Sequence, residues 1–268
     1  MKIKETIGIM GVGNMGSAIV EGLIKKKIAR PSQILAYDKI GEKAEAFVKL
    51  WKARRTSSNR ELVRKAEVIL LAFKPQDLFE AAGEFQPELK KSHVLISILA
   101  GTPQAKIRKA LGTQPALVRA MPNLGAKVGE AMTVLTGSKT ESVRLAEQIF
   151  SACGRTLQLE EKYFDLVTAI SGSGPAYFFF VMELLAREGV SQGLSQQDAE
   201  LLAVQTAVGA ACLAQTAKDS PEGLRRMVTS KGGTTEAALK VLETKNFPGI
   251  FHQALEAALK RGQELSRV

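Results

Sequence analysis

Short apolar runs alternate with amphipathic segments through the first half of the chain. The runs occupy residues 6–12, 34–38, 68–73, 94–99, 116–122 and 132–137. Most are apolar at consecutive positions, which is typical of strands buried on both faces. The segments between them, such as 14–27 and 41–50, repeat their apolar residues with helical spacing. This alternation predicts a parallel sheet covered by helices on both sides, completed by a helix from Glu141 to Cys153.

Only helical periodicity remains after residue 160. Helices are predicted over residues 176–188, 195–218, 234–245 and 247–263. The segments that begin at Ser195 and Thr234 resemble N-terminal capping sequences. Small residues between Ala203 and Ala217 favour close approach of two helices. The chain is therefore predicted to contain an α/β domain over residues 1–159 and an all-α domain over residues 160–268.

The composition is that of a soluble globular protein, with 268 residues, 45% of them hydrophobic and 24% charged. The apolar run 176–182 ends at Glu183 and is too short to span a bilayer, and the N-terminus lacks the pattern of a secretory signal. Cys153 and Cys212 lack metal-ligand spacing, so we expect both to be reduced, buried and structural. These features predict a cytoplasmic protein with no metal site and no membrane partner.

The net charge of +10 is concentrated in the first 160 residues. A basic half-chain raises the question of nucleic-acid binding. The positive charges are scattered in short groups, such as 25–27, 54–55 and 90–91, without interleaved aromatic residues. We interpret them as a solvated surface that attracts anions weakly, and we expect no nucleic-acid partner.

A glycine-rich motif, Gly11-x-Gly13-x-x-Gly16, lies between the first predicted strand and the first predicted helix. In a dinucleotide-binding domain the first glycine allows the tight turn, the second admits the pyrophosphate, and the third lets helix and strand pack closely. The helix N-terminus adds unpaired N–H groups and a partial positive charge. The motif is weak alone, but its place between a strand and a helix predicts a Rossmann-type dinucleotide-binding domain.

Two opposing signals bear on which nicotinamide nucleotide binds. Asp38 ends the second predicted strand, where an acidic residue commonly accepts a hydrogen bond from the ribose 2′-hydroxyl of NAD. Lys39 follows it, and several basic residues between Lys52 and Arg60 could neutralise a 2′-phosphate. Because the basic groups are several, we favour NADP, as NADPH, with NAD as the alternative cofactor.

Three further loops are expected to meet the cofactor because they follow predicted strands. They are residues 72–76, 99–102 and 119–123. In an open α/β sheet, ligands bind outside the carboxyl ends of the strands. Lys74 could contact a phosphate or a ribose there, although an ordinary surface lysine is an equal alternative.

Six segments, taken together, resemble one enzyme family. They are GIMGVGNMGSAI, AFKPQ, ILAGT, VRAMPN, ISGSGPAYFF and VTSKGGTTEAAL. Their order and approximate spacing resemble those of Δ1-pyrroline-5-carboxylate reductases over nearly the whole chain, and the last segment is the most specific. The resemblance implies a Rossmann-type domain followed by a helical dimerisation domain. It also implies NAD(P)H-dependent reduction of the cyclic imine 1-pyrroline-5-carboxylate to L-proline, the last step of proline biosynthesis.

The resemblance further implies where the substrate binds. In this family the glycine-rich turn of the helical domain holds the substrate carboxylate through backbone N–H groups, and Thr235 matches the group that hydrogen-bonds the ring nitrogen. The same turn could also be a helix-capping turn. Glu161 matches a position near the substrate, where a surface glutamate is an equal alternative. The candidate substrate-binding residues are Glu161, Ser230, Gly232, Gly233, Thr234 and Thr235.

The implied chemistry needs few side chains, because most of it is the positioning of the nicotinamide carbon against the imine carbon. A proton could be relayed by Thr235, Ser173 or a water, so the candidate catalytic residues are Thr235 and Ser173. His93 and His252 are expected to be structural. The candidate cofactor-binding residues are Gly11, Gly13, Asn14, Met15, Gly16, Asp38, Lys39, Asn59, Ala72, Lys74, Pro75, Ala100, Gly101 and Asn123.

The chain also departs from the family pattern. Lys231 stands where proline is usual, Leu124 and Gly125 stand where Thr-Pro is frequent, and Glu130 or Ala131 stands where glycine is frequent. Lys231 could strengthen carboxylate binding or loosen a turn that proline would fix. These departures leave room for an altered substrate or a weakened enzyme.

Two other function classes compete with this interpretation. A β-hydroxyacid dehydrogenase uses a lysine on the first helix after a glycine-rich turn, and the stretch around Phe178 and Phe179 has none. A related imine oxidoreductase is another alternative. A non-catalytic protein that senses NAD(P) shares the fold, but the intact turn 229–235 argues against it.

The helical domain is expected to form a homodimer or a higher homo-oligomer. Its segments 175–186 and 203–217 offer more apolar surface than about 110 residues easily bury alone. We expect the substrate site at the junction of the two domains, with helices from a second subunit as further contributors.

Overall fold

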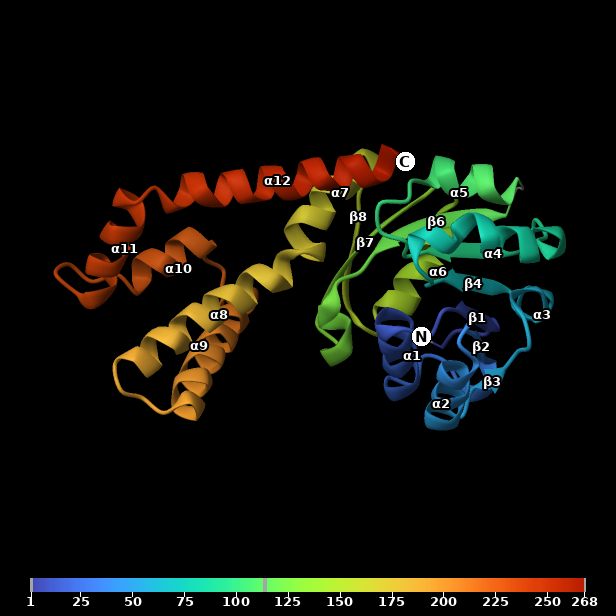
Figure 1. The fold of residues 1–268 in the computed structure, drawn as a ribbon, viewed down its shortest axis with the longest axis horizontal. Helices are drawn as coiled ribbons and strands as arrows, with labels where there is room; N and C mark the ends of the chain where they lie inside the picture. The colour runs from blue at the N-terminus through green and yellow to red at the C-terminus, as the bar shows by residue number, and fades with distance from the viewer. Residues whose placement is uncertain (1, 113–114, 268) are drawn as a thin grey trace. The chain divides into compact units, whose positions relative to one another are not determined.

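One mostly parallel sheet forms the framework of the first part of the chain (Figure 1). The structure is a computed structural model that describes residues 2–112 and 115–267. Within these residues eight strands lie in the order β3-β2-β1-β4-β5-β6-β7-β8. All neighbouring pairs are parallel except β6 and β7, which are antiparallel. The strands are β1 Ile7–Met10, β2 Ile34–Tyr37, β3 Arg54–Arg55, β4 Val68–Leu71, β5 Val94–Ser97, β6 Ala116–Met121, β7 Ala131–Gly137 and β8 Gly154–Gln158.

The six strands expected from the apolar runs are present, and two short strands were missed. β3 consists of two exposed arginines, and β8 has no fully buried residue. Both lie at an edge of the sheet, where one side of the strand is unpaired. Such strands carry no run of apolar residues, so hydrophobic periodicity could not detect them.

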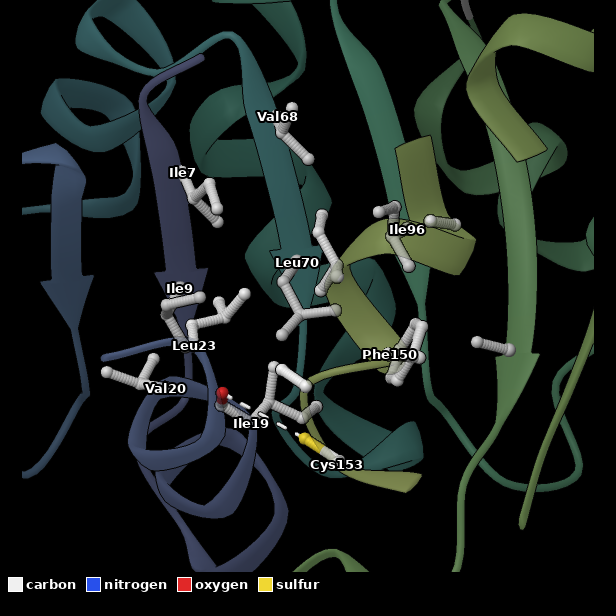
Figure 2. Close-up of a cluster of buried hydrophobic side chains, with 14 of the residues drawn as sticks. Ile7, Ile9, Ile19, Val20, Leu23, Val68, Leu70, Ile96, Phe150 and Cys153 are labelled. Carbon is white, nitrogen blue, oxygen red and sulfur yellow. Dashed lines mark hydrogen bonds between the residues drawn. The ribbon is translucent and has the colours of Figure 1, made fainter. Parts of the chain in front are cut away.

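Helices cover both faces of this sheet, as the doubly apolar strands predict. Alternate residues of the central strands enter two separate cores, so Ile9 packs with one and Met10 with the other. One core receives α1 Asn14–Lys25, α2 Gly41–Trp51 and α6 Thr140–Phe150, and Figure 2 shows Ile19, Leu23 and Phe150 against Ile9 and Leu70. The other receives α3 Asn59–Lys65, α4 Leu78–Phe85 and α5 Gln104–Leu111.

The two cysteines differ in their surroundings. Cys153 is buried beside α1, with its Sγ 3.8 Å from the carbonyl oxygen of Ala18 (Figure 2). Burial raises the pKa of its thiol to about 11, so the thiol is protonated and unreactive at neutral pH. Cys212 is exposed, so the expectation that both cysteines are buried is wrong. It lies on a helix whose outer face is uncovered in a single chain.

The chain divides into two compact units. The first unit is Met1–Gly172 together with Leu259–Val268, and the second unit is Ser173–Ala258. The chain therefore leaves the first unit after Gly172 and returns to it at Leu259. This division falls after residue 160, because residues 160–172 belong to the compact unit that contains the sheet. Residues 259–267 belong to the same unit. The domain boundary at residues 159 and 160 remains a prediction.

The remaining helices follow the predicted all-α pattern. They are α7 Phe164–Val167, α8 Gly174–Ser191, α9 Gln196–Thr216, α10 Pro221–Met227, α11 Thr234–Thr244 and α12 Phe247–Arg267, with a π-helical turn Thr168–Gly172 before α8. Ser195 caps α9 as expected, because its Oγ accepts a hydrogen bond from the N–H of Asp198 at 3.1 Å. α8 and α9 approach through small residues, since Ala186, Ala199 and Ala203 form their buried contact.

Much of the apolar surface of the second unit is uncovered in a single chain. The exposed large apolar residues of α8 and α9 include Phe178, Phe179, Phe180, Val181, Leu185, Leu201, Leu202 and Leu213. By length and composition alone, the helical stretch Glu161–Ser191 could cross a membrane. This corrects the expectation of a segment that is too short, because the structure joins residues 176–182 to the helical turns before and after them. Many large apolar side chains exposed on one pair of helices mark a surface that another molecule covers.

His93 predicts how stability depends on pH. The ring is 5% exposed and its Nδ1 accepts a hydrogen bond from the N–H of Lys90. Burial, and secondarily the charge of Lys90, lowers the pKa of His93 below 6.5. The folded state therefore binds fewer protons, so this contribution to stability is complete above about pH 6.5 and is lost as the pH falls below it.

We expect the melting temperature to decrease as the pH is lowered from about 7.5 to about 5.5. A His93→Gln variant should lose part of this dependence on pH. The two carboxylates whose pKa values are most strongly lowered titrate well below this window. The pKa of Glu61 is lowered to about 2 by its hydrogen bonds, chiefly that from Lys65, and that of Glu88 to about 2 by those from Arg64 and Arg60. An equally steep profile in the variant, measured by calorimetry, would contradict the assignment to His93.

Candidate active site

The glycine-rich turn between β1 and α1 has two crowded positions and one open position. Gly11 has φ +96°, and a Cβ there would lie 2.7 Å from the backbone of Ala72. A Cβ at Gly16 would lie 2.3 Å from the carbonyl oxygen of Gly11. At Gly13, by contrast, no described atom lies within 4 Å of that position. Gly11 and Gly16 are therefore required by the backbone, whereas Gly13 leaves space for another molecule.

The start of α1 faces this turn with unpaired donors. Gly13 is the N-cap residue, and within the described chain no side chain caps it. Asn14, Met15 and Gly16 form the first helical turn, whose N–H groups lack partners within the helix. Together with the helix dipole, these groups can hold an anion at this position.

A cavity of about 360 Å³ in the first unit gathers half of the predicted cofactor residues. It lies at the carboxyl ends of β1, β2 and β4, where open α/β sheets bind ligands. The predicted residues that line it are Gly11, Gly13, Asp38, Lys39, Asn59, Ala72 and Lys74. Of the others, Pro75 opens a short 3-10 turn, Ala100 and Gly101 follow β5, and Asn123 follows β6.

Asp38 holds the glycine-rich turn to the neighbouring loop. Its Oδ2 accepts a hydrogen bond from the N–H of Val12 at 3.0 Å, and its Oδ1 accepts one from the N–H of Ile40 at 3.0 Å. Both carboxylate oxygens therefore bind backbone donors, although each can accept further bonds. Asp38, which the sequence predicts to accept a hydrogen bond from a ribose hydroxyl, therefore also fixes the shape of the glycine-rich turn.

Charges of both signs surround the cavity. Lys39 Nζ lies 3.1 Å from Asp77 Oδ1, and this hydrogen bond is the main reason that the pKa of Lys39 is raised. Asn59 Nδ2 donates to Glu84 Oε2 at 2.8 Å. The remaining charged residues that line the cavity are Lys43, Lys74 and Glu80.

Glu161 is bonded entirely within the first unit. Its Oε1 accepts hydrogen bonds from the N–H of Gln104 at 2.7 Å and from Arg119 Nη1 at 3.1 Å. The side chain of Arg119 is 4% exposed, and its guanidinium lies 4.7 Å from the ring centroid of Phe164. Burial lowers the pKa of Arg119, and Glu161 opposes that effect. Sequence reasoning did not single out Arg119, although a charged residue inside the apolar run 116–122 was an available signal.

Two N–H groups of the turn 229–235 already donate hydrogen bonds to nearby residues of the chain. The N–H of Gly232 donates to Glu236 Oε2 at 2.7 Å, and the N–H of Gly233 donates to the carbonyl oxygen of Ser230 at 3.0 Å. Gly232 has φ +72°, a conformation that favours glycine. α11 begins at Thr234, so the N–H groups of Thr234 and Thr235 lie in its first turn and lack partners within the helix.

A hollow of about 700 Å³ in the second unit borders this turn. Its lining includes Gly232 and Gly233, the cationic side chains of Arg225, Arg226 and Lys240, and the carboxylates of Glu236 and Glu243. Ser173 lies apart from it in the sequence, as the N-cap residue of α8 after the π-helical turn. In the described parts of the chain, His, Cys, Asp and Glu side chains form no group that could hold a metal ion.

One of the positions that depart from the family pattern, Gly125, has a local explanation. A Cβ at Gly125 would lie 2.5 Å from the carbonyl oxygen of Glu130, so the 3-10 turn Leu124–Val128 needs glycine there. Asn123 Oδ1 accepts hydrogen bonds from the N–H groups of Gly125 and Met132. The MPN segment therefore stabilises its own loop. Lys231 is exposed, and nothing in the structure explains its replacement of proline.

Comparison with known proteins links both units to one family. Residues 161–265 match the family model described as pyrroline-5-carboxylate reductase dimerisation, and residues 6–101 match the one described as coenzyme F420-dependent NADP oxidoreductase. A pyrroline-5-carboxylate reductase of Pseudomonas aeruginosa is 38% identical over 97% of this chain and 96% of its own length. A pyrroline-5-carboxylate reductase from Synechocystis is 37% identical, and the similarity covers 97% of this chain and 98% of that protein.

Solved structures agree with this similarity. A pyrroline-5-carboxylate reductase from Coxiella burnetii has a TM-score of 0.92 and 36% identity, and covers 99% of this chain and 100% of that one. The Plasmodium falciparum pyrroline carboxylate reductase, solved with NADP bound, has a TM-score of 0.87 and 29% identity. The similarity covers 99% of this chain and 100% of that one. The similarity therefore covers the sheet domain and the helical domain together.

The glycine-rich turn allows a matched pair of variants. Gly13→Ala places a methyl group in open space at φ −66°, so we expect the melting temperature to stay near that of the wild type. The methyl group would occupy the space next to the α1 N-terminus, and we expect nucleotide affinity to fall at least about tenfold. Gly16→Ala forces a side chain against the carbonyl of Gly11 and should cost stability by about 1–3 kcal/mol.

Thermal melts and fluorescence titration with NADPH measure both effects. Unchanged NADPH affinity in a folded Gly13→Ala protein would contradict the assignment of this turn to the pyrophosphate.

Proposed function

The chain belongs to the pyrroline-5-carboxylate reductase family, and from this premise we propose that it reduces the cyclic imine 1-pyrroline-5-carboxylate to L-proline with NADPH. The observation that carries this conclusion is the similarity across both units, because curated relatives of that name align with 97% of the chain. The reaction is the last step of proline biosynthesis.

The glycine-rich turn fits the nicotinamide dinucleotide. The open Cβ position at Gly13 and the first-turn N–H groups of α1 suit a pyrophosphate. Gly11, Gly13 and Ala72 would line the pyrophosphate side, with Lys39 and Lys43 available to a 2′-phosphate at the mouth of the cavity. When bound, the cofactor supplies the hydride that the imine carbon accepts. NADPH is the favoured cofactor, and NAD remains the alternative.

We assign the substrate carboxylate to the start of α11. The N–H groups of Gly232 and Gly233 already donate to Glu236 and to Ser230, so the role of these glycines is to shape the turn. The N–H groups of Thr234 and Thr235 are then the donors for the carboxylate, reinforced by the helix dipole. Three cationic side chains against two carboxylates leave the lining of the adjoining hollow net positive, which favours an anion there. Glu161 and Ser230 remain substrate-side candidates.

Thr235 has the second role, which is to orient the ring nitrogen. Its hydroxyl can donate a hydrogen bond to that nitrogen or relay the proton that the product amine needs. Ser173 and a water are the other routes for this proton. None of these roles requires a metal ion or a covalent intermediate, because positioning of the reacting carbons supplies most of the rate.

The helical domain assembles copies of this chain, in keeping with its match to a dimerisation family. We propose a homodimer as the smallest assembly, in which the exposed apolar faces of α8 and α9 are covered. A second copy would bury that surface without any need for a membrane. We further propose that the protein acts in the cytoplasm and has no nucleic-acid partner.

Turnover with Thr235→Ala tests the substrate assignment. We expect the wild type to oxidise NADPH when 1-pyrroline-5-carboxylate is added. In Thr235→Ala the loss of the hydroxyl should lower kcat by at least about tenfold, while NADPH affinity stays within about twofold, because Thr235 lies outside the nucleotide-binding unit. Thr235→Ser, which keeps the hydroxyl, should recover most of the rate.

An equal loss of NADPH affinity in Thr235→Ala would place Thr235 with the cofactor and refute its assignment to the substrate. Absence of turnover by the wild type with NADPH still bound would refute the proposed reaction itself.

The oligomer prediction uses two residues of equal exposure. Phe178 on α8 is 67% exposed and Leu50 on α2 is 68% exposed in a single chain. Phe178→Glu should shift the protein towards a monomer, because a charge would be buried in the interface. Leu50→Glu should leave the assembly unchanged. Light scattering coupled to size-exclusion chromatography measures both, and an intact oligomer in Phe178→Glu would contradict this interface.

A further inference from the structure

The loop that follows β5 is held from one side by Glu161. This loop, residues 99–103, leads from the carboxyl end of β5 to α5 and includes the predicted cofactor residues Ala100 and Gly101. Glu161 Oε1 accepts a hydrogen bond at 2.7 Å from the N–H of Gln104, the first residue of α5. The carboxylate therefore satisfies one of the unpaired donors at that helix start, and Arg119 keeps it in place at 3.1 Å.

The other side of the loop is in contact with the C-terminal end of the chain. Gly101 has φ +60°, and a Cβ built on it would lie 2.9 Å from the Cβ of Leu265 and 3.5 Å from its carbonyl carbon. The last turns of α12 therefore lie directly against the backbone of Gly101. A larger residue at position 101 would collide with the helix.

α7 and the end of α12 are also joined to each other. Ser266 Oγ donates a hydrogen bond to Asp165 Oδ1 at 2.7 Å, in a partly buried position. Gly262 is buried one turn earlier, and a Cβ there would lie 3.5 Å from the Cβ of Asp165. α12 and α7 are therefore in van der Waals contact at this point.

These two segments are the points at which the chain leaves and re-enters the first unit. Residues 161–167 precede the exit after Gly172, and the end of α12 follows the return at Leu259. Both connections to the second unit therefore meet at one loop of the nucleotide-binding unit.

We propose that Glu161, Asp165, Leu265 and Ser266 form a clasp that positions the loop after β5 for the nicotinamide cofactor. This inference rests on the proposed function only in assigning that loop to the cofactor. The four residues are positioning residues, since they act through the loop. The clasp makes the last turns of α12 a part of the cofactor site.

Breaking the hydrogen bond between Asp165 and Ser266 tests the clasp. The variants are Asp165→Ala, Ser266→Ala and the double variant, each measured as the full-length protein. Two readouts are independent of turnover: hydrogen exchange of the amides in residues 99–104 without nucleotide, and the Kd for NADPH by fluorescence titration. Asp165→Asn keeps an acceptor oxygen and serves as the conservative variant. Lys260→Ala, on an exposed position of the same helix, is the matched control.

We expect each single alanine variant to speed exchange in the loop and to raise the Kd for NADPH by about threefold to tenfold, within the range that one ordinary hydrogen bond contributes. The double variant should be no worse than either single variant, because both remove the same bond. Asp165→Asn and Lys260→Ala should behave like the wild type.

Faster exchange confined to the end of α12, with loop exchange and NADPH affinity unchanged, would overturn the clasp and leave only a stabilised helix end. Failure of the proposed function looks different. If the wild type binds NADPH but does not reduce 1-pyrroline-5-carboxylate, the substrate is wrong while the clasp remains testable by both readouts. If faster loop exchange leaves NADPH affinity unaltered, the loop is held by the clasp but does not serve the cofactor, and the proposal is refuted.

Discussion

The burial of the sheet on both faces is the constraint from which the nucleotide site follows. All four residues of β1 and all four of β4 are buried, so no polar side chain within these strands can reach solvent. Chemistry is therefore confined to the strand ends, where the chain turns towards a helix. The turn requires Gly11 because its backbone lies against that of Ala72, and it requires Gly16 because α1 begins against the carbonyl oxygen of Gly11. The helix N-terminus and the open space at Gly13 follow from the same packing.

Carboxylates that hold backbone N–H groups recur at the functional loops. Asp38 binds the N–H of Val12, Glu161 that of Gln104, and Glu236 that of Gly232. Each fixes a loop next to the start of a helix, where unpaired donors collect. A carboxylate in such a place both satisfies a donor and stabilises the helix dipole. The loops that meet small molecules thus gain their shape from short polar contacts rather than from apolar burial.

The second unit, unlike the sheet, leaves much of its apolar surface exposed. Its helices meet through small residues such as Ala186 and Ala199, and they leave large aromatic side chains exposed. A single copy cannot bury that surface, so assembly completes the unit that the chain alone leaves open.

The sequence by itself determined the order of elements, the glycine-rich turn and the family, because these depend on local periodicity and on motifs of a few residues. It predicted six strands, the cap at Ser195 and the helical second half, all of which are present. Only the tertiary structure decided which polar side chains face one another across long separations. Arg119 meets Glu161, and Ser266 meets Asp165, because the sheet and the returning helix bring distant segments together. Residue type and spacing carry no record of such contacts.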